Sequence, residues 1–200
     1  HWMGWKGNPV DEIEFRVVHE TASRVMALKK GDIDGCDGYL PVDQIEKLEK
    51  DPNVTVYKEQ SMRIFLIRMH NQRPPYNDVH VRRAISYAFD YDSFINEILK
   101  GRVARNYGPI PNNMWGAPQD LKGYTYDLEK AKAYLKKSAY PDGGIELEYV
   151  YVQGLESERK MGLVLIDNLS KLNIKVKMVP LTWVNMKARG SKVETSPEMM

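Results

Sequence analysis

The stretch Ile145–Val179, IELEYVYVQGLESERKMGLVLIDNLSKLNIKVKMV, gives the clearest indication of the fold class. Its beginning, Ile145–Val152, alternates apolar side chains with glutamates, which is typical of a strand with one buried face. Apolar residues at three-to-four spacing follow in Met161–Leu172 and indicate an amphipathic helix, and Asn173–Val179 alternates again. A strand, a crossover helix and a strand in this order favour a parallel, right-handed β-α-β unit. The sequence therefore predicts an α/β protein.

The stretch Tyr76–Gly101, YNDVHVRRAISYAFDYDSFINEILKG, predicts two short helices placed end to end. Its apolar residues recur with the spacing of one helix face on either side of the letters DYD. Asp78 and Asp90 are the expected N-caps and Gly101 is the expected stop, while Asp127 is expected to cap a later helix. Because helix ends account for these polar residues, we interpret the stretch as scaffold.

The part of the chain before Tyr76 predicts alternating strands and helices. Strands are expected in residues 10–18, 53–59 and 63–70, and a short one begins at Gly31 and runs into a glycine-rich loop. Helices are expected in residues 20–31 and 41–50. The polar, proline-rich segment 71–78 then crosses to the paired helices, so we expect a domain boundary near it.

The composition indicates a soluble, globular chain of one or two domains. Of its 200 residues, 42% are hydrophobic and 28% are charged, which is enough to bury a core. The formal net charge of +2 gives no electrostatic footprint for nucleic acid. The single cysteine, Cys36, excludes an intrachain disulfide and leaves the redox compartment open. No apolar run approaches the roughly 20 residues of a membrane span and no leader precedes the first strand, so we expect an excerpt of a longer protein.

Residues that carry catalysis or metal binding do not form a recognisable motif. The histidines include no pair three or four residues apart on one expected helix, so we predict no metal site. Cys36 has no cationic neighbour in sequence that would lower the pKa of its thiol. Phosphate-binding loops are missing, and the carboxylates alternate with lysines as on a solvated surface. We therefore predict no catalytic residue and no cofactor.

Aromatic and polar residues in loops remain as candidates for recognition. Tyr39 lies in the glycine-rich loop, and Arg63 and Phe65 lie at the approach to the domain boundary. Met114 and Trp115 lie in the long segment 101–126, which has several glycines and prolines and little periodicity, as functional or mobile loops do. For the tryptophan, a plug that anchors its loop on the core is an equal alternative to ligand contact.

The order of these motifs resembles the family 5 extracellular solute-binding proteins of bacterial and archaeal ABC importers. The matching stretches are VDEIEFRVV, ALKKGDIDG, PPYNDVHVRRAISYAFDYDSFINEILKG, YGPIPNNMWG, YDLEKAKAYLKKSAYPDGG and LTWVNMKA, within residues 2–189. The resemblance implies a two-lobed fold of the periplasmic-binding-protein type II kind, with part of lobe 1 and the hinge strand in residues 1–64 and the first part of lobe 2 in residues 65–200. The family's chains are longer, and their later stretch that grips a peptide's amino terminus is not included here.

The resemblance also implies a function without bond making or breaking. Two lobes would close on a solute, most readily a peptide, and the closed form would dock on a membrane permease outside the cytoplasm, in the periplasm or on the outer face of the membrane. A lipid anchor on the full-length protein is left open. The same fold binding an oligosaccharide, an opine or a nickel chelate is one alternative, and an α/β hydrolytic enzyme is an alternative of a different class.

The residue types in the loops and the resemblance to the family together predict which residues lie near the ligand cleft. They are Asp37, Gly38, Tyr39, Arg63 and Phe65 from lobe 1 and the hinge, with Met114 and Trp115 from lobe 2. Gly38 allows close backbone approach, Arg63 can pair with a carboxylate, and the aromatic rings offer flat apolar walls. Other roles stay open: Phe65 in the core, Arg63 paired with Glu59, and Asp37 as the acceptor of a turn.

Overall fold

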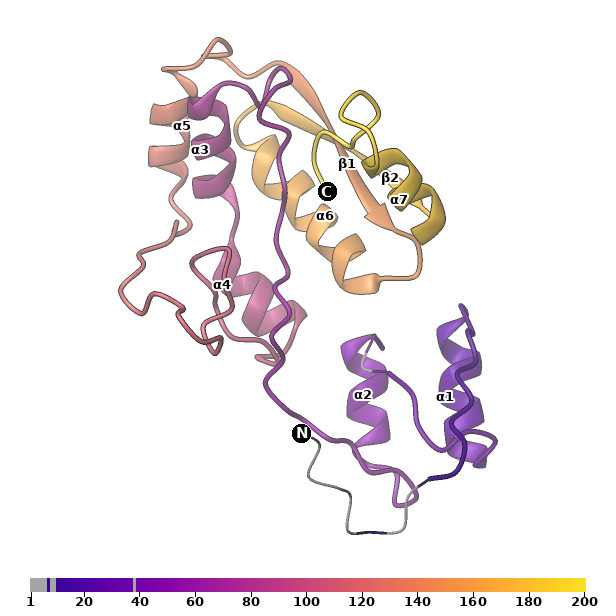
Figure 1. Ribbon diagram of the computed structural model, residues 1–200. Coiled ribbons are helices and arrows are strands. Elements are labelled where there is room, and N and C mark those ends of the chain that lie inside the picture. Colours follow the sequence, from indigo (N-terminus) through magenta and orange to yellow (C-terminus); the bar gives the residue numbers. More distant parts are fainter. Residues whose placement is uncertain (1–6, 8–9, 38) are drawn as a thin grey trace. The chain divides into compact units, whose positions relative to one another are not determined.

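The computed structural model describes residues 7, 10–37 and 39–200 (Figure 1). The chain divides into two compact units, His1–Cys36 and Asp37–Met200, and each is considered by itself. None of the helices in the described residues is long and apolar enough to cross a membrane.

In the first unit, the helix expected in residues 20–31 is confirmed as α1, Thr21–Lys30. The Glu20 side chain accepts hydrogen bonds from the first turn, and Gly31 ends the helix with a left-handed φ of 76°. The strand expected in residues 10–18 is wrong, because this segment has no regular secondary structure. Its apolar side chains are exposed, Phe15 by 89%. A strand needs a neighbour that satisfies its N–H and C=O groups, and none pairs with it among the described residues.

In the second unit, the predicted β-α-β unit is confirmed. The strands β1, Ile145–Val152, and β2, Ile174–Leu181, pair in parallel with Ile145 opposite Ile174. The helix α6, Glu156–Ser170, connects them. The α/β fold class therefore holds.

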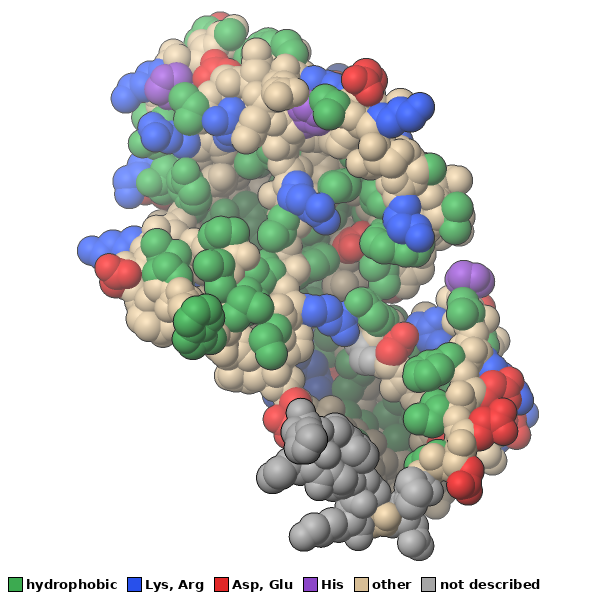
Figure 2. All heavy atoms as spheres, viewed as in Figure 1, with side chains coloured by type: hydrophobic (Ala, Val, Ile, Leu, Met, Phe, Trp, Pro, Cys, Tyr) green, Lys and Arg blue, Asp and Glu red, His purple; other side chains and the backbone are tan. Residues whose placement is uncertain are grey.

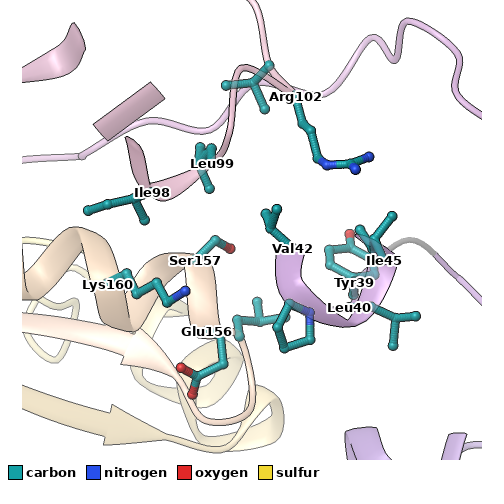
Figure 3. Close-up of a pocket in the computed structure, with 13 residues that line it drawn as sticks. Tyr39, Leu40, Val42, Ile45, Ile98, Leu99, Arg102, Glu156, Ser157 and Lys160 are labelled. Atoms are coloured by element: carbon teal, nitrogen blue, oxygen red, sulfur yellow. The ribbon is translucent and has the colours of Figure 1, made fainter. Parts of the chain in front are cut away.

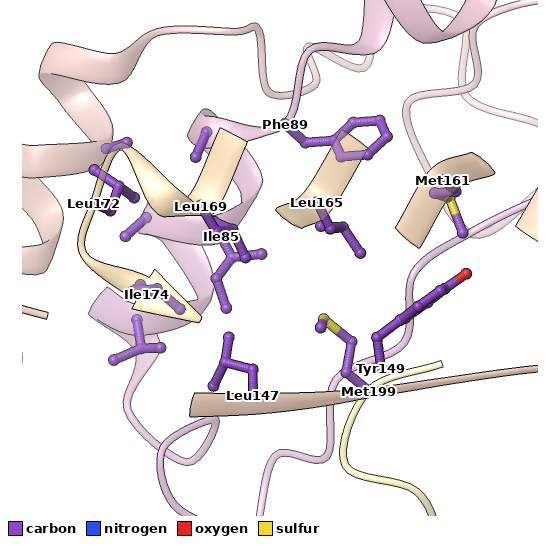
Figure 4. Close-up of a cluster of buried hydrophobic side chains, with 14 of the residues drawn as sticks. Ile85, Phe89, Leu147, Tyr149, Met161, Leu165, Leu169, Leu172, Ile174 and Met199 are labelled. Carbon is purple, nitrogen blue, oxygen red and sulfur yellow. The ribbon is translucent and has the colours of Figure 1, made fainter. Parts of the chain in front are cut away.

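Part of the core of the second unit lies between α6 and the sheet (Figure 4). Met161, Leu165 and Leu169 come from one face of α6, and Leu147 and Tyr149 come from the facing side of β1. All five side chains are buried. The three-to-four spacing on the helix and the alternation on the strand thus meet at one interface, as amphipathic elements require.

The paired helices of Tyr76–Gly101 are also confirmed. They are α3, Val79–Ala88, followed by the single turn α4, Tyr91–Ser93, which continues as the π-helix η1, Phe94–Ile98. The Asp78 side chain accepts the N–H of His80 at 2.7 Å, and the Asp90 side chain accepts the N–H of Ser93 at 3.1 Å. These are the predicted caps.

The described residues of the second unit include three further helices. The helix α5, Leu128–Leu135, begins at its predicted cap Asp127 and packs against α3 (Figure 1). The helix α2, Val42–Leu48, confirms the helix expected in residues 41–50, and α7, Trp183–Gly190, follows β2.

The other strands expected before Tyr76 are wrong over most of their length. Residues 31–37 and 53–59 form no strand. Of residues 63–70, only the end pairs: Met69 bridges to Met199, which also bridges to Tyr149 of β1. The N–H of Arg68 donates to the carbonyl of Met200 at 2.7 Å. Residues 68–70 and the C-terminal residues 198–200, which are distant in sequence, therefore pair with each other beside the edge of β1.

Candidate functional site

Two of the predicted site residues, Tyr39 and Arg63, lie together. The guanidinium carbon of Arg63 is 4.2 Å from the centre of the Tyr39 ring, the geometry of a cation–π contact. Asp37 accepts the N–H of Tyr39 at 3.1 Å, a short-range hydrogen bond of the kind that its alternative role as a turn acceptor anticipated. Arg63 and Glu59 form no ion pair in the described part of the chain. Gly38 lies outside the described residues.

Tyr39 borders a cavity of about 240 Å³, here called the α2–α6 cavity (Figure 3). Its walls come from the turn before α2, from α2, from η1 and the segment after it, and from the start of α6. The lining residues are mostly apolar: Tyr39, Leu40, Pro41, Val42, Ile45, Ile98, Leu99, Arg102, Val103, Leu155, Glu156, Ser157 and Lys160. An apolar wall with a few polar groups is the usual composition of a small-ligand pocket.

The charged groups of the α2–α6 cavity differ in whether they have partners. Arg102 donates from both terminal nitrogens to Glu49, at 2.9 and 2.6 Å, and this hydrogen bonding lowers the pKa of the Glu49 carboxyl. Glu156 pairs with Arg159 at 2.9 Å. Lys160 has no ion-pair partner among the residues described here.

Phe65 lies at a second cavity, of about 520 Å³, which is lined by β1, α6, α7 and residues 64–68. Its ring stacks on Phe94 of η1, with ring centres 6.3 Å apart. Phe65 is therefore partly packed against the core and partly exposed, and its contact with a ligand stays a prediction. In the same cavity, Glu158 accepts the N–H of Val152 at 2.7 Å. Burial raises the pKa of its carboxyl, against the opposing effects of this bond and of Arg68.

Met114 and Trp115 lie on the long loop and line neither of these two cavities. The side chain of Asn106 accepts the N–H of Asn112 at 3.0 Å, and Arg105 donates to the carbonyl of Tyr124 at 2.6 Å, so hydrogen bonds order the loop from within. Trp115 is 97% exposed, so its ring does not pack on the core formed by the described part of the chain. Figure 2 shows hydrophobic side chains among the lysines and arginines on the surface. Membership of all seven predicted residues in one cleft stays a prediction.

Sequence reasoning missed the contribution of α6 to the α2–α6 cavity. Leu155, Ser157 and Lys160 line it from the segment that directly follows β1. Ligands of proteins with parallel α/β sheets bind beyond the carboxyl ends of the strands. The position of these residues directly after the predicted strand could therefore have identified them as candidates. Ile98, Leu99 and the residues of α2 carried no such signal, since apolar helix faces normally pack in a core.

Metal-ligating side chains do not gather in the described part of the chain. No group of three or more histidine, cysteine, aspartate or glutamate residues there could hold a metal ion.

The chain belongs to the bacterial extracellular solute-binding proteins, family 5, whose middle-region model matches residues 1–196. Family 5 members are solute-binding proteins, and the predicted class and extracytoplasmic location agree with this membership.

Individual relatives agree in sequence and in fold. The chain is 34% identical over 193 residues to the probable D,D-dipeptide-binding periplasmic protein DdpA of Escherichia coli, covering 96% of this chain and 36% of that protein. It is 26% identical over 200 residues to heme-binding protein A of Haemophilus influenzae, covering 97% and 36%. It superposes with a TM-score of 0.80 and 28% identity on the periplasmic binding protein DppA from Helicobacter pylori in complex with the peptide STSA, covering 92% and 35%.

The coverages show how much of the relatives' length this chain represents. The chain spans about 36% of the length of the curated relatives it matches. Its structure is accordingly part of a two-lobed periplasmic-binding-protein fold, as the motif order implied.

Proposed function

We propose that this chain is part of the solute-binding component of an ABC importer and that the whole protein binds peptides by closure of two lobes. Residues 1–64 would belong to lobe 1 with the hinge strand, and residues 65–200 to the first part of lobe 2. The observation that carries the proposal is the fold match, at 28% identity, to a binding protein holding the peptide STSA, together with the relative named for D,D-dipeptide binding.

The α2–α6 cavity supports this proposal chemically. A peptide presents apolar side chains, a charged group at each end and a main chain rich in hydrogen-bonding groups. The cavity offers apolar walls, the ring of Tyr39 with Arg63 over it, and the hydroxyl of Ser157. A ligand that touches groups from both lobes raises the closed population by its differential affinity for that state. A membrane permease would then receive the closed, loaded form.

One alternative is a different solute in the same fold. The relative named heme-binding protein A, at 26% identity, adds haem to the nickel chelates and oligosaccharides as a candidate solute. The alternative of a hydrolytic enzyme has no comparable observation in its favour, and we propose that the protein catalyses no reaction.

The test uses the complete gene product and isothermal titration calorimetry. Di- to pentapeptides, oligosaccharides, nickel chelates and haem are titrated in turn, with single amino acids as the control. We expect saturable binding of peptides. If haem or a nickel chelate binds saturably and no peptide binds, that solute, and not a peptide, is the ligand of the protein. Peptide hydrolysis that one point mutation abolishes would instead establish an enzyme.

A further inference from the structure

The helices α3 and α5 lie side by side, and aromatic rings from both of them stack on one another (Figure 1). The ring of Tyr134 from α5 stacks on Tyr87 of α3, with ring centres 5.5 Å apart, and on His80, at 6.2 Å. Tyr124, which is 39% exposed, meets the Tyr87 ring edge-on at 5.0 Å. We call these four residues the aromatic row. They line neither of the two cavities described above.

Two of the cations beside the aromatic row have no ion pair among the described residues. The guanidinium carbon of Arg83 lies 5.5 Å from the centre of the Tyr134 ring, and the Nζ atom of Lys137 lies 5.7 Å from it. Both side chains are exposed and neither forms an ion pair there, whereas the neighbouring Lys130 pairs with Asp127 at 3.1 Å. Two uncompensated charges are therefore held at one ring and face solvent.

This region is more positive than the chain as a whole. Residues 78–88 and 127–137 contain six Lys and Arg against three Asp and Glu, a surplus of three, whereas the surplus over all 200 residues is two. Of the three acids, two cap helices and Glu129 pairs with Lys132 at 2.9 Å. Figure 2 shows Lys and Arg side chains gathered over these helices, at its upper left. Such a surface attracts an anionic partner, most strongly at low ionic strength.

Tyrosine rings beside lysine and arginine side chains are typical of protein surfaces that meet the boundary between a membrane and water. The ring has an apolar body and a polar hydroxyl, and the cations attract anionic headgroups. Two helices packed side by side present a broad face, which suits an extended surface better than a single bound chain. If the protein delivers its solute to a permease, a membrane surface lies within its reach.

We propose that the aromatic row, together with Arg83, Lys130 and Lys137, binds the anionic phospholipid headgroups of a membrane surface. The inference rests on the proposed function for one point, that the protein works beside a membrane. It adds a reversible, salt-dependent attachment that keeps the protein near its permease and leaves the α2–α6 cavity free. An acidic surface of another protein is the rival partner.

The experiment measures how the complete polypeptide, produced without a lipid anchor, sediments with phospholipid vesicles. Vesicles of phosphatidylcholine alone are compared with vesicles that also contain phosphatidylglycerol, in low and in high salt. The test variant is Arg83→Gln/Lys137→Gln. The matched control is Lys175→Gln/Lys177→Gln, which removes two exposed cations of β2 that have no ion pair in the described part of the chain. Thermal unfolding and peptide calorimetry check the fold and the ligand binding of each variant.

We expect the wild type to bind vesicles that contain phosphatidylglycerol at low salt, to leave them at high salt, and not to bind phosphatidylcholine alone. A lysine or arginine near an anionic surface contributes about fivefold in affinity, so Arg83→Gln/Lys137→Gln should weaken binding by about 20-fold. Because its cations lie outside the proposed face, Lys175→Gln/Lys177→Gln should weaken binding by less than about twofold. Peptide affinity should be the same in all three proteins.

The inference is overturned if the wild type does not bind the anionic vesicles. It is also overturned if both double variants lose binding equally, because binding would then follow the net charge and not this face. If Arg83→Gln/Lys137→Gln binds anionic vesicles normally but associates less with the permease in uncharged lipid, the partner is a protein and the lipid assignment is wrong. Vesicle binding without binding of any solute would overturn the proposed function instead.

Discussion

The side-chain carbonyl of Asn168 accepts a hydrogen bond from the backbone N–H of Asp90 at 2.9 Å, which ties the last turn of α6 to the junction between α3 and α4. Asn168 is a buried polar side chain, 4% exposed, on the face of α6 that otherwise packs apolar residues. Burial of an amide is tolerated where its hydrogen bonds are made. The same Asp90 then begins α4 by capping it with its own side chain.

Asn168→Leu should therefore lower the free energy of unfolding. The substitution leaves the N–H of Asp90 without its acceptor in a partly buried place, which costs about 1–3 kcal/mol. Urea unfolding monitored by circular dichroism measures the difference. Asn185→Leu, at an exposed position of α7, is the control and should change stability by less than about 0.5 kcal/mol. Equal stability of the Asn168 variant and the wild type would show that the bond carries no net stabilisation.

Gly162 of α6 sets how closely this helix approaches the sheet. A methyl group there would lie 2.6 Å from the end of the Met178 side chain and 2.8 Å from the ring of Tyr149. Gly162→Ala should destabilise the protein by about 1–3 kcal/mol through overpacking, although alanine is the better helix former. Gly190→Ala, where a methyl group would meet nothing within 4 Å, should leave stability unchanged or raise it. Thermal unfolding of both variants measures the change in stability. A Gly162→Ala variant that is more stable than the wild type would contradict the close approach of α6 to the sheet at this position.

The elements that the sequence predicted are those whose determinants are local. Asp78, Asp90 and Asp127 cap helices within a few residues of themselves, and each does so in the structure. The β-α-β unit follows from three consecutive segments with clear periodicity. Such signals can be read from a short window, because the partner groups lie close along the chain.

The errors involve partners that are distant in sequence. The expected strand in residues 10–18 has the right alternation but no paired neighbour among the described residues. Arg68 pairs with Met200, and nothing in either local sequence indicates this. The candidate site also depends on residues that are distant in sequence. The sequence predicted that Arg63 and Tyr39 would both lie near a ligand, but it did not predict their contact with each other. Lys160 lines the cavity because the sheet holds α6 beside it, which the sequence around Lys160 does not indicate.

The carboxyl of Glu158 should make the free energy of unfolding fall as the pH rises, whereas the aspartates that cap helices should make it rise. Burial raises its pKa in the folded protein above the ordinary value of 4.5. The folded state then holds more protons than the unfolded state just above pH 4.5, so this contribution to the free energy of unfolding is full at lower pH and is lost as the pH rises through the folded pKa. Glu158→Gln keeps an oxygen for the N–H of Val152 and removes the titration.

Urea unfolding between about pH 2 and pH 7 spans both titrations, that of Glu158 above pH 4.5 and that of Asp127 below pH 3.8. The stability of Glu158→Gln relative to the wild type should increase as the pH rises. Asp127→Asn supplies the contrast, because hydrogen bonding from the Lys130 N–H lowers the pKa of Asp127 below 3.8, so its contribution is lost as the pH falls. The same sign of pH dependence for both variants would contradict the burial of Glu158.

The last prediction concerns the assignment of Arg63 and Trp115 to the ligand cleft of the complete protein. Trp115→Ala should not alter folding, since the ring is 97% exposed in the structure. Arg63→Ala removes a guanidinium whose contact is the face of Tyr39, so its cost to folding should be small as well. Any loss of affinity in either variant then reports on ligand contact and not on stability.

Each substitution should weaken binding of the best peptide by about five- to tenfold or more, because a buried stacked ring or a paired guanidinium contributes upwards of about 1 kcal/mol. Met62→Ala, at an exposed neighbouring position, is the control and should bind like the wild type. Calorimetry gives the affinities, and the tryptophan fluorescence of the wild type, compared with Trp115→Ala, shows whether that ring is covered on binding. If the peptide binds both variants as tightly as the wild type, the cleft assignment is wrong even though peptide binding itself stands. If only the Trp115 variant is unaffected, the cleft is limited to the Tyr39 and Arg63 side, because an exposed ring that ligand never covers has no means of stabilising the complex.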